Sequence, residues 1–224
     1  MPDAPRPVAP LALTVFYDVH CPYSDRVLTW LADLGDRVAP TYRAFALEQV
    51  NADSSATSWR IWEQPLDYEH YRGLQNRRAL AAFLAIVLAE QAGPREAVDR
   101  FRLAVSHARH TAAGDVSDLA LLLRLAAEAG IDRDELERLL GDPTAVDAAR
   151  ARIREDWLDA RGDYAIFGVP TLRLDGEAPF YLRLEAVPQN GQAETLLASV
   201  RGFHEGLPRV LEIKVPERVR RSDF

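Results

Sequence analysis

The 224-residue sequence contains a single cysteine, Cys21. One cysteine excludes an internal disulfide, so any disulfide that the chain forms joins it to another molecule. No apolar run is long enough to cross a bilayer, and the start of the chain, MPDAPRPVAP, lacks the basic-then-apolar pattern of a secretory signal. An excess of basic residues is also missing: the net charge of −7 argues against a nucleic-acid binder. We therefore expect a cytoplasmic protein with neither a membrane nor a nucleic acid as partner.

What is present is the composition of an ordinary globular protein, with 48% hydrophobic and 27% charged residues. A chain of this length can bury a substantial core, as one large domain or as one domain that carries an insertion. The proline-rich residues 1–10 predict a flexible N-terminal arm.

The stretch from Leu11 to Leu34 predicts a buried strand that runs directly into a helix. Residues 11–19 are apolar and rich in β-branched and aromatic types, as in a strand covered on both faces. From Asp25 onward the apolar residues recur three and four apart, which is the period of an amphipathic helix. Cys21 and Pro22 then occupy the N-cap and first turn, where a proline is tolerated.

This position predicts a reactive cysteine. The unpaired N–H groups and the positive dipole end of a helix N-terminus favour a thiolate, so we expect a lowered pKa for Cys21. The hydroxyl of Ser24 can turn toward the same sulfur, and a protonated His20 would add a positive charge nearby. The alternative is a small buried residue that fills a strand-to-helix corner.

Further along, residues 39–47 predict a second strand, parallel to the first, and residues 48–58 a polar loop. Trp59 and Trp62 follow, and we expect them to pack rather than to bind a ligand. Residues 66–162 are rich in alanine, leucine, arginine and glutamate and predict helices over 67–91, 94–109, 117–129, 132–140 and 143–162. The first of these helices is either continuous or broken near Gly73.

His107 and His110 are spaced three apart within the helical segment, a spacing that could suit a metal. No third ligand is evident in the sequence, so we expect no metal site.

Strand character returns at residues 165–174 and 180–184, which predict an antiparallel hairpin, and residues 193–204 predict a final helix. An extended segment is expected at 211–215. The order of elements indicates one α/β domain with a helical insertion. Pro170 interrupts the apolar run 165–174, a conflict that a cis Val169–Pro170 bond would resolve, although trans is the commoner form of such bonds.

A strand leading into C-P-x-S at a helix start, a helical insertion, then G-V-P-T before a hairpin and a last helix resembles the thioredoxin-like superfamily. More narrowly, it resembles the DsbA-like branch, which includes FrnE-like proteins, kappa-class glutathione transferases and 2-hydroxychromene-2-carboxylate isomerases. The resemblance implies a thioredoxin-like domain formed by residues 11–64 and 163–224, with residues 65–162 as an inserted helical domain. It also implies that Val169 and Pro170 form a cis-proline loop facing Cys21, and that the backbone before the proline pairs with a bound peptide or thiol.

The departures from the family pattern matter. DsbA-like oxidoreductases carry a second cysteine where this chain has Ser24, so Cys21 cannot close an intramolecular disulfide. Kappa-class transferases read S-P-Y-S, with a serine at the position of Cys21 whose hydroxyl stabilises a glutathione thiolate. The chain thus combines features of two chemistries.

Three hypotheses follow. In the first, the protein is a monothiol (C-P-Y-S) thiol–disulfide oxidoreductase or isomerase, and an external thiol resolves a mixed disulfide at Cys21. In the second, it is a kappa-like transferase or isomerase that binds a small thiol such as glutathione near Val169 and uses Tyr23, Ser24 or Cys21 to hold its sulfur. In the third, it is a binding module in which Cys21 is structural.

The candidate catalytic residues are Cys21, Ser24 and His20, and the resemblance adds Pro22, Tyr23, Val169, Pro170 and Thr171 as substrate-binding residues. Asp18 is interpreted either as a buried proton relay or as a cap of the following turn. Arg26 is interpreted either as a contact for a ligand carboxylate or as a solvent-exposed residue. We expect no tightly bound cofactor, a disulfide-containing protein or a small thiol as substrate, and a homodimer as one possible assembly.

Overall fold

The computed structural model describes residues 9–53, 58–70 and 72–202. The described residues fall into two compact units, one up to Val187 and the other from Pro188 onward. In the described residues, no helix is long and apolar enough to cross a membrane.

The first unit is built on a four-stranded sheet with the order β2-β1-β3-β4. Its strands are β1 (Leu11–Tyr17), β2 (Val38–Ala44), β3 (Thr171–Leu174) and β4 (Phe180–Tyr181). β1 and β2 pair in parallel with Val15 opposite Tyr42, whereas β3 runs antiparallel to both β1 and β4. The predicted parallel pair and the antiparallel hairpin are both confirmed. β1 lies in the middle of the sheet, and Val15 and Phe16 on it are fully buried.

Helix α1 (Pro22–Leu34) connects β1 to β2, with Cys21 as its N-cap residue, as predicted. Its buried residues include Val27, Leu28 and Leu31, which recur at the helical period. Gly35, with φ of 52°, ends the helix in a backbone conformation that favours glycine.

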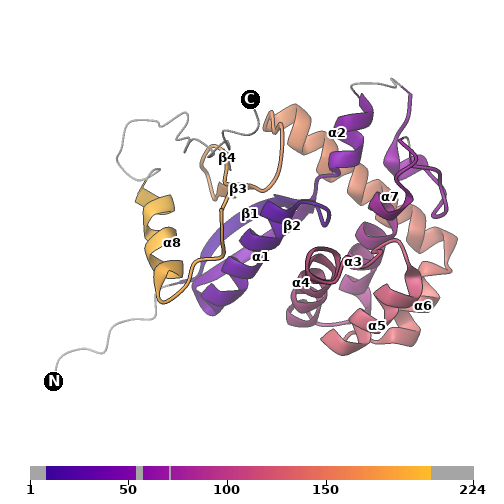
Figure 1. The fold of residues 1–224 in the computed structure, drawn as a ribbon, viewed down its shortest axis with the longest axis horizontal. Helices are drawn as coiled ribbons and strands as arrows, with labels where there is room; N and C mark the ends of the chain where they lie inside the picture. The colour runs from indigo at the N-terminus through magenta and orange to yellow at the C-terminus, as the bar shows by residue number, and fades with distance from the viewer. Residues whose placement is uncertain (1–8, 54–57, 71, 203–224) are drawn as a thin grey trace, which may run out of the picture. The chain divides into compact units, whose positions relative to one another are not determined.

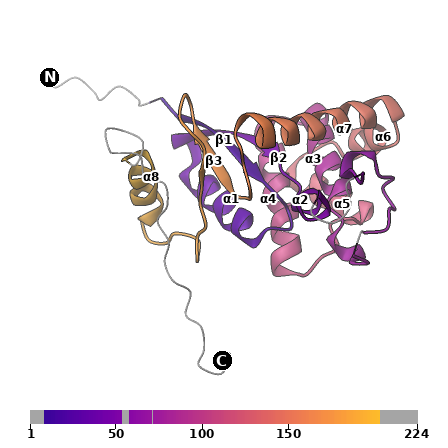
Figure 2. The same cartoon turned by 90° about the horizontal axis from the view of Figure 1, so that it is seen from above.

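The other helices of this unit lie between β2 and β3 in the sequence and gather beside the sheet (Figures 1 and 2). They are α2 (Leu47–Asp53), α3 (Leu80–Ala92), α4 (Arg95–Thr111), α5 (Leu119–Ala129), α6 (Arg133–Leu140) and α7 (Pro143–Leu158). α3 is apolar around most of its circumference because α4, α5, α6 and α7 all pack against it. The predicted starts and ends of α4 to α7 agree with the structure within a few residues, except that α7 is followed by a π-helical turn at Asp159–Asp163.

Two predictions in this region are wrong. Residues 48–58 were expected to be a loop, but α2 begins at Leu47, where the carboxylate of Asp18 accepts a hydrogen bond from the backbone N–H. The helix expected over residues 67–91, with a break near Gly73 as the alternative, begins only at Leu80. The described residues from 67 to 79 are mostly irregular, with a turn at Gly73 (φ 67°), the position of that alternative break. The Arg78 guanidinium donates to the carbonyls of Leu66 and Tyr68 and so holds this segment in its non-helical path.

The strand predicted over residues 165–174 is also shorter than expected, because only Thr171–Leu174 are extended. Trp59 and Trp62, which come earlier in the sequence, pack as expected, and the Trp59 ring lies 6.0 Å from the Tyr68 ring. The Trp62 and Trp157 rings lie 6.3 Å apart, and Trp157 stacks on Phe45.

The second unit contains α8 (Gln192–Gly202), which agrees with the predicted final helix up to its last described residue. The predicted end of that helix at residue 204 and the extended segment at 211–215 lie outside the described residues. The division into a thioredoxin-like domain and an inserted helical domain remains a prediction.

Candidate functional site

Cys21 lies at the corner between β1 and α1. Its backbone is extended (φ −91°, ψ 114°), and its N–H donates to the carbonyl of Asp18 at 3.1 Å, which closes the turn. Pro22 follows as the first helical residue, where its missing N–H has no helical partner. The side chain of Cys21 is 4% exposed, so the sulfur lies below the surface.

The proline loop faces this sulfur. The Cys21 thiol donates a hydrogen bond to the carbonyl oxygen of Val169 at 3.3 Å, across 148 positions of sequence. The Val169–Pro170 peptide bond is cis. A hydrogen bond joins the two ends of the loop, since the Thr171 hydroxyl donates to the Gly168 carbonyl at 2.7 Å. The structure therefore brings together Cys21 and the predicted residues of the loop.

The expected low pKa of Cys21 is wrong for the free protein. Burial raises the pKa of the thiol above its ordinary value of 9.0, and the carboxylate of Asp18 raises it further. The backbone N–H and hydroxyl of Ser24 and the backbone N–H of Tyr23 lower it, as a helix N-terminus should. Here desolvation outweighs the helix terminus, and Cys21 is a thiol at neutral pH.

Ser24 is fully buried beneath the cysteine, at the position that the sequence indicated. Its hydroxyl interacts with the Cys21 sulfur and accepts a weak hydrogen bond from the backbone N–H of Asp18 at 3.3 Å. It therefore connects the sulfur to the end of β1 and keeps a polar group next to the thiol.

His20 does not supply the positive charge expected of it. Arg109 donates to Nδ1 of the imidazole at 2.9 Å, so Nδ1 carries no proton and Nε2–H faces the carbonyl of Arg78 at 3.3 Å. Burial lowers the pKa of His20 to about 4, and the charge of Arg109 lowers it as well. The ring is neutral at physiological pH and serves as a bridge between three segments of the chain.

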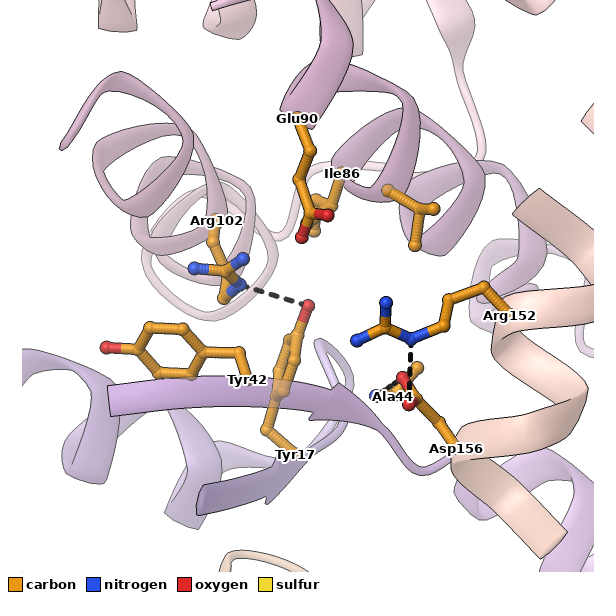
Figure 3. Close-up of a pocket in the computed structure, with 9 residues that line it drawn as sticks. Tyr17, Tyr42, Ala44, Ile86, Glu90, Arg102, Arg152 and Asp156 are labelled. Carbon is orange, nitrogen blue, oxygen red and sulfur yellow. Dashed lines mark hydrogen bonds and ion pairs between the residues drawn. The ribbon is translucent and has the colours of Figure 1, made fainter. Parts of the chain in front are cut away.

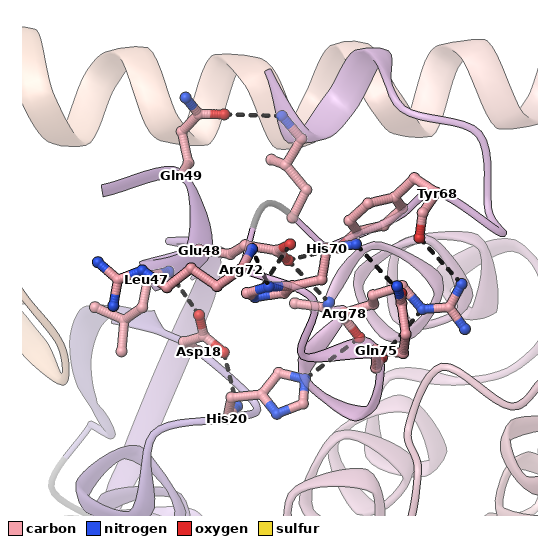
Figure 4. Close-up of polar contacts among 12 residues, drawn as sticks. Asp18, His20, Leu47, Glu48, Gln49, Tyr68, His70, Arg72, Gln75 and Arg78 are labelled. Carbon is pink, nitrogen blue, oxygen red and sulfur yellow. Dashed lines mark hydrogen bonds and ion pairs between the residues drawn. The ribbon is translucent and has the colours of Figure 1, made fainter. Parts of the chain in front are cut away.

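Asp18 is buried below Cys21, and its interpretation as a cap fits the structure. Its two carboxylate oxygens accept hydrogen bonds from the backbone N–H groups of His20 at 2.7 Å and Leu47 at 2.6 Å (Figure 4). Burial raises the pKa of Asp18 to about 6, although both hydrogen bonds lower it. Asp18 thus connects the turn before Cys21 to the start of α2.

A second buried acid, Glu48, lies in the same polar network and was missed by sequence reasoning (Figure 4). Its carboxylate accepts a hydrogen bond from the Tyr68 hydroxyl at 2.5 Å and lies 3.6 Å from Nε2 of His70. Burial raises the pKa of Glu48 to about 7. The residue stands in a stretch with the composition of a polar loop, so no local signal distinguishes it from an exposed glutamate.

The half-buried ring of Tyr23 forms the other side of the site. Arg183 donates to the Tyr23 hydroxyl, and the guanidinium groups of Arg183 and Arg26 lie 4.1 Å and 5.2 Å from the centre of the ring. Arg26 also donates to the carbonyl of Leu184 at 2.7 Å, so its interpretation as a purely solvent-exposed residue is wrong. Nothing in the spacing of residues along the chain indicated the contribution of Arg183.

The two histidines of α4 contact different groups. Nε2 of His107 lies 3.0 Å from the Thr29 hydroxyl, and Nε2 of His110 donates to the Val19 carbonyl at 3.0 Å. Over the described ranges of the chain, no three His, Cys, Asp or Glu side chains group as metal ligands would. The histidines tie α4 to α1 and to the turn before Cys21.

A small polar pocket lies elsewhere, between the end of the β1–β2 pair and helices α3, α4 and α7 (Figure 3). None of the predicted site residues lines it. The buried guanidinium of Arg102 stacks on the Tyr42 ring at 4.0 Å and donates to the Tyr17 hydroxyl at 3.3 Å. On the opposite wall Arg152 pairs with Asp156 at 3.1 Å. These groups satisfy one another, which is the pattern of a structural network.

Comparisons with known proteins identify the family to which the chain belongs. Residues 12–198 match the DSBA-like thioredoxin domain family. An uncharacterized protein of Mycobacterium tuberculosis is 31% identical over 203 residues, which cover 90% of this chain and 80% of that protein. The resemblance first seen in the two motifs is confirmed.

Several solved structures share the fold. A probable DsbA oxidoreductase from Streptomyces coelicolor is similar with a TM-score of 0.54 and 20% identity, over 92% of this chain and 94% of that one. The cytosolic disulfide reductase DsbM from Pseudomonas aeruginosa, solved with GSH, has a TM-score of 0.54 and 19% identity, over 86% and 100%. A 2-hydroxychromene-2-carboxylate isomerase has a TM-score of 0.54 and 18% identity, over 86% of this chain and 95% of that one. The predicted thioredoxin-like α/β fold with a mostly helical middle segment is therefore confirmed.

Proposed function

Because the chain belongs to the DSBA-like thioredoxin domain family, we propose that it is a monothiol thiol–disulfide oxidoreductase or isomerase that acts through Cys21. The observation that carries the proposal is the 3.3 Å contact between the Cys21 sulfur and the Val169 carbonyl. This contact supports the proposal because the single cysteine of the chain lies against the proline loop, whose backbone we expect to hold the partner of a disulfide.

The proposed reaction is an exchange. The Cys21 thiol loses its proton to solvent, and the thiolate attacks one sulfur of a substrate disulfide, forming a Cys21–substrate bond as the substrate S–S bond breaks. The leaving thiolate takes up a proton. An external low-molecular-weight thiolate then attacks the substrate sulfur of the mixed disulfide and forms a new disulfide with it as the Cys21–substrate bond breaks, and the released Cys21 thiolate takes up a proton. The external thiol supplies the reducing equivalents, and the protein ends in its starting state.

Ser24 stands where a resolving thiol would be required for an internal disulfide. Its buried hydroxyl interacts with the sulfur but cannot attack the mixed disulfide at neutral pH. The mixed disulfide therefore persists until another thiol arrives, which favours reduction, isomerisation or removal of a small thiol over net oxidation of dithiols. In this proposal Cys21 is the nucleophile and Ser24 is a polar neighbour of its sulfur. His20 is a neutral residue that positions the turn before Cys21.

One observation favours a second candidate function. Cys21 is a protonated hydrogen-bond donor in the free protein, because burial raises its pKa. A thiol in that state could donate to the thiolate of a bound small thiol, as the serine of kappa-class transferases does, and take no covalent part. Glutathione is the ligand this comparison suggests, since the similar DsbM structure was solved with GSH.

Intact mass after incubation with a small disulfide tests the proposal. The wild type is expected to gain one thiol adduct that added thiol removes, whereas Cys21→Ser gains none. Ser24→Cys is the matched variant: it should lose two hydrogens on oxidation and retain no adduct. If the native wild type gains no adduct above pH 8, while the unfolded chain does, the proposal is wrong. Retention of a reduced thiol by Cys21→Ser without a covalent bond would support the second candidate.

The proposal also covers the residues that contact the substrate, the cellular location and the kind of substrate. Pro22, Tyr23, Val169, Pro170 and Thr171 are proposed to contact the substrate. A cytoplasmic location fits a reaction that depends on a reducing thiol pool. The substrate would be a disulfide-containing protein or a small disulfide, with no tightly bound cofactor.

A further inference from the structure

Two positive charges lie against one aromatic ring two residues after Cys21. The guanidinium carbons of Arg183 and Arg26 are 4.1 Å and 5.2 Å from the centre of the Tyr23 ring. Each ring–cation contact is favourable, and together the contacts bring two guanidinium groups to the same aromatic side chain. An anionic ligand that reaches this ring would be attracted by both charges.

The Arg26 side chain is held in place by contacts that use only part of its hydrogen-bond donors. One N–H of its guanidinium donates to the Leu184 carbonyl at 2.7 Å. A guanidinium has five N–H donors, and no carboxylate in the described parts of the chain forms an ion pair with Arg26. Because the side chain is fixed by Leu184 and Tyr23, little conformational freedom remains to be lost when a ligand binds.

The same cluster lies beside the reactive sulfur. Arg183 and Tyr181 come from the segment that follows the proline loop, and the Leu182 N–H donates to the Pro170 carbonyl at 3.1 Å. Burial raises the pKa of the Tyr181 phenol; among its charged neighbours Arg183 lowers that pKa, whereas Cys21 and Tyr23 raise it. Phe167 extends this surface, with its ring 5.3 Å from that of Tyr181 and its side chain 67% exposed.

Resting on the proposed reaction of Cys21, we propose that its substrate is a low-molecular-weight disulfide that carries carboxylates, selected by Arg26 and Arg183. Guanidinium groups bind carboxylates through paired hydrogen bonds, and the exposed rings of Phe167 and Tyr181 offer apolar contact for the rest of a small molecule. The chain as a whole has a net charge of −7 and repels anions. The local positive charge of Arg26 and Arg183 would therefore be needed to attract an anionic substrate.

Three small aliphatic disulfides that differ in charge test this selection: 3,3′-dithiodipropionate (anionic), bis(2-hydroxyethyl) disulfide (neutral) and cystamine (cationic). In each case the Cys21 thiolate forms one new S–S bond and releases one thiolate. The rate of adduct formation is measured by intact mass for the wild type and for the Arg26→Gln/Arg183→Gln double variant, at one pH and low salt. Dividing the wild-type rate by the variant rate for each probe cancels the intrinsic reactivity of that probe.

The double variant is expected to react about 5- to 10-fold more slowly with dithiodipropionate, within about twofold of the wild type with the neutral probe, and faster with cystamine. Salt should reduce the difference, and the Arg26→Lys/Arg183→Lys variant should restore the order of the probes. Arg133→Gln, which removes an exposed charge at the start of α6, is the matched control and should leave all three rates unchanged.

Equal slowing with all three probes would mean that the arginines only support the structure, and equal rates of the wild type and the double variant would mean that they play no part; either result overturns the inference and leaves the proposed reaction standing. Failure of the native wild type to react with any probe overturns the proposed reaction, and the inference falls with it.

Discussion

Arg109 donates a hydrogen bond to Nδ1 of His20 at 2.9 Å, immediately before the cysteine of the proposed site. A permanent cation that uses the imidazole as an acceptor fixes the neutral form of the ring. The histidine therefore cannot act as the cationic partner of a thiolate, and its contribution to the site is to position the turn between β1 and α1.

His20 makes stability depend on pH in a defined direction. Its pKa is about 4 in the folded protein and 6.5 when the chain is unfolded, so the unfolded state binds more protons between these values. The stability from His20 is fully present above pH 6.5 and is lost as the pH falls toward 4. Between pH 7 and pH 5 the loss should be about 2 kcal/mol.

Urea unfolding of the wild type and His20→Gln at both pH values measures this contribution. The free-energy difference between the two proteins is expected to change by about 2 kcal/mol, with the wild type losing more on acidification. His107→Gln is the control. A difference that stays constant between pH 7 and pH 5 would contradict a buried neutral histidine.

Glu48 should act in the opposite sense. Its pKa is raised from 4.5 to about 7 in the folded protein, so the folded state binds more protons between these values. This contribution to stability is present at low pH and is lost as the pH rises from 4.5 toward 7. Glu48→Gln keeps an oxygen that can accept from Tyr68 and cannot ionise.

Relative to the wild type, Glu48→Gln is therefore expected to gain about 2 kcal/mol of stability as the pH rises from 5 to 7. Urea unfolding at the two pH values checks the expectation, with Glu63→Gln, on the 3₁₀ turn η2 (Ile61–Glu63), as an exposed control. An identical pH dependence of Glu48→Gln and the wild type would show that the carboxyl group is not buried as described.

The reactivity of Cys21 should rise with pH and reach no plateau in the neutral range. Only the thiolate reacts, and burial holds the pKa of the thiol above its usual value of 9.0. Labelling by a small neutral alkylating reagent, followed by intact mass between pH 6 and pH 10, gives the profile. A plateau below pH 8 would restore the low pKa that the helix terminus alone predicts.

Two substitutions should move that profile in opposite directions. Asp18→Asn removes a negative charge that raises the pKa of Cys21, so labelling at pH 8 is expected to be several-fold faster. Ser24→Ala removes a hydroxyl that lowers the pKa, so labelling is expected to be slower. Asp33→Asn, an exposed change on α1, is the control. Shifts of the same sign for Asp18→Asn and Ser24→Ala would contradict the assigned roles.

The parts of the site that the sequence predicted are those fixed by local patterns. The strand-to-helix joint follows from hydrophobic periodicity and from a proline at the first helical position, and these placed Cys21 at the N-cap. The contact between Val169 and Cys21 spans 148 positions of sequence, and it could be predicted only from the resemblance to a family.

The missed features depend on desolvation and on long-range partners. Whether a helix terminus lowers the pKa of a thiol depends on how much chain covers it, and Cys21 is covered. Glu48 and Arg183 are unremarkable polar residues in the sequence, and each acquires its role from a residue distant along the chain, Tyr68 and Tyr23 respectively. Burial of this kind is a property of the folded chain.

The last prediction concerns Arg102, which joins α4 to the β1–β2 pair beside the polar pocket (Figure 3). Its guanidinium is almost fully buried, stacks on Tyr42, donates to the Tyr17 hydroxyl and pairs with Asp99. Arg102→Ala leaves the Tyr17 hydroxyl without this partner and opens a cavity, so we expect a loss of about 2–4 kcal/mol in the free energy of unfolding.

Arg102→Met restores much of the volume without the charge and separates the two effects. If packing dominates, it should recover about half of the loss, because a buried ionic group is often replaceable by an apolar one. Arg124→Ala, which breaks the exposed pair with Glu128, should change stability by no more than about 0.5 kcal/mol. Urea unfolding of the three variants measures these differences. A loss for Arg102→Ala as small as that for Arg124→Ala would mean that the network contributes little, and that α4 is held to the sheet by its apolar residues alone.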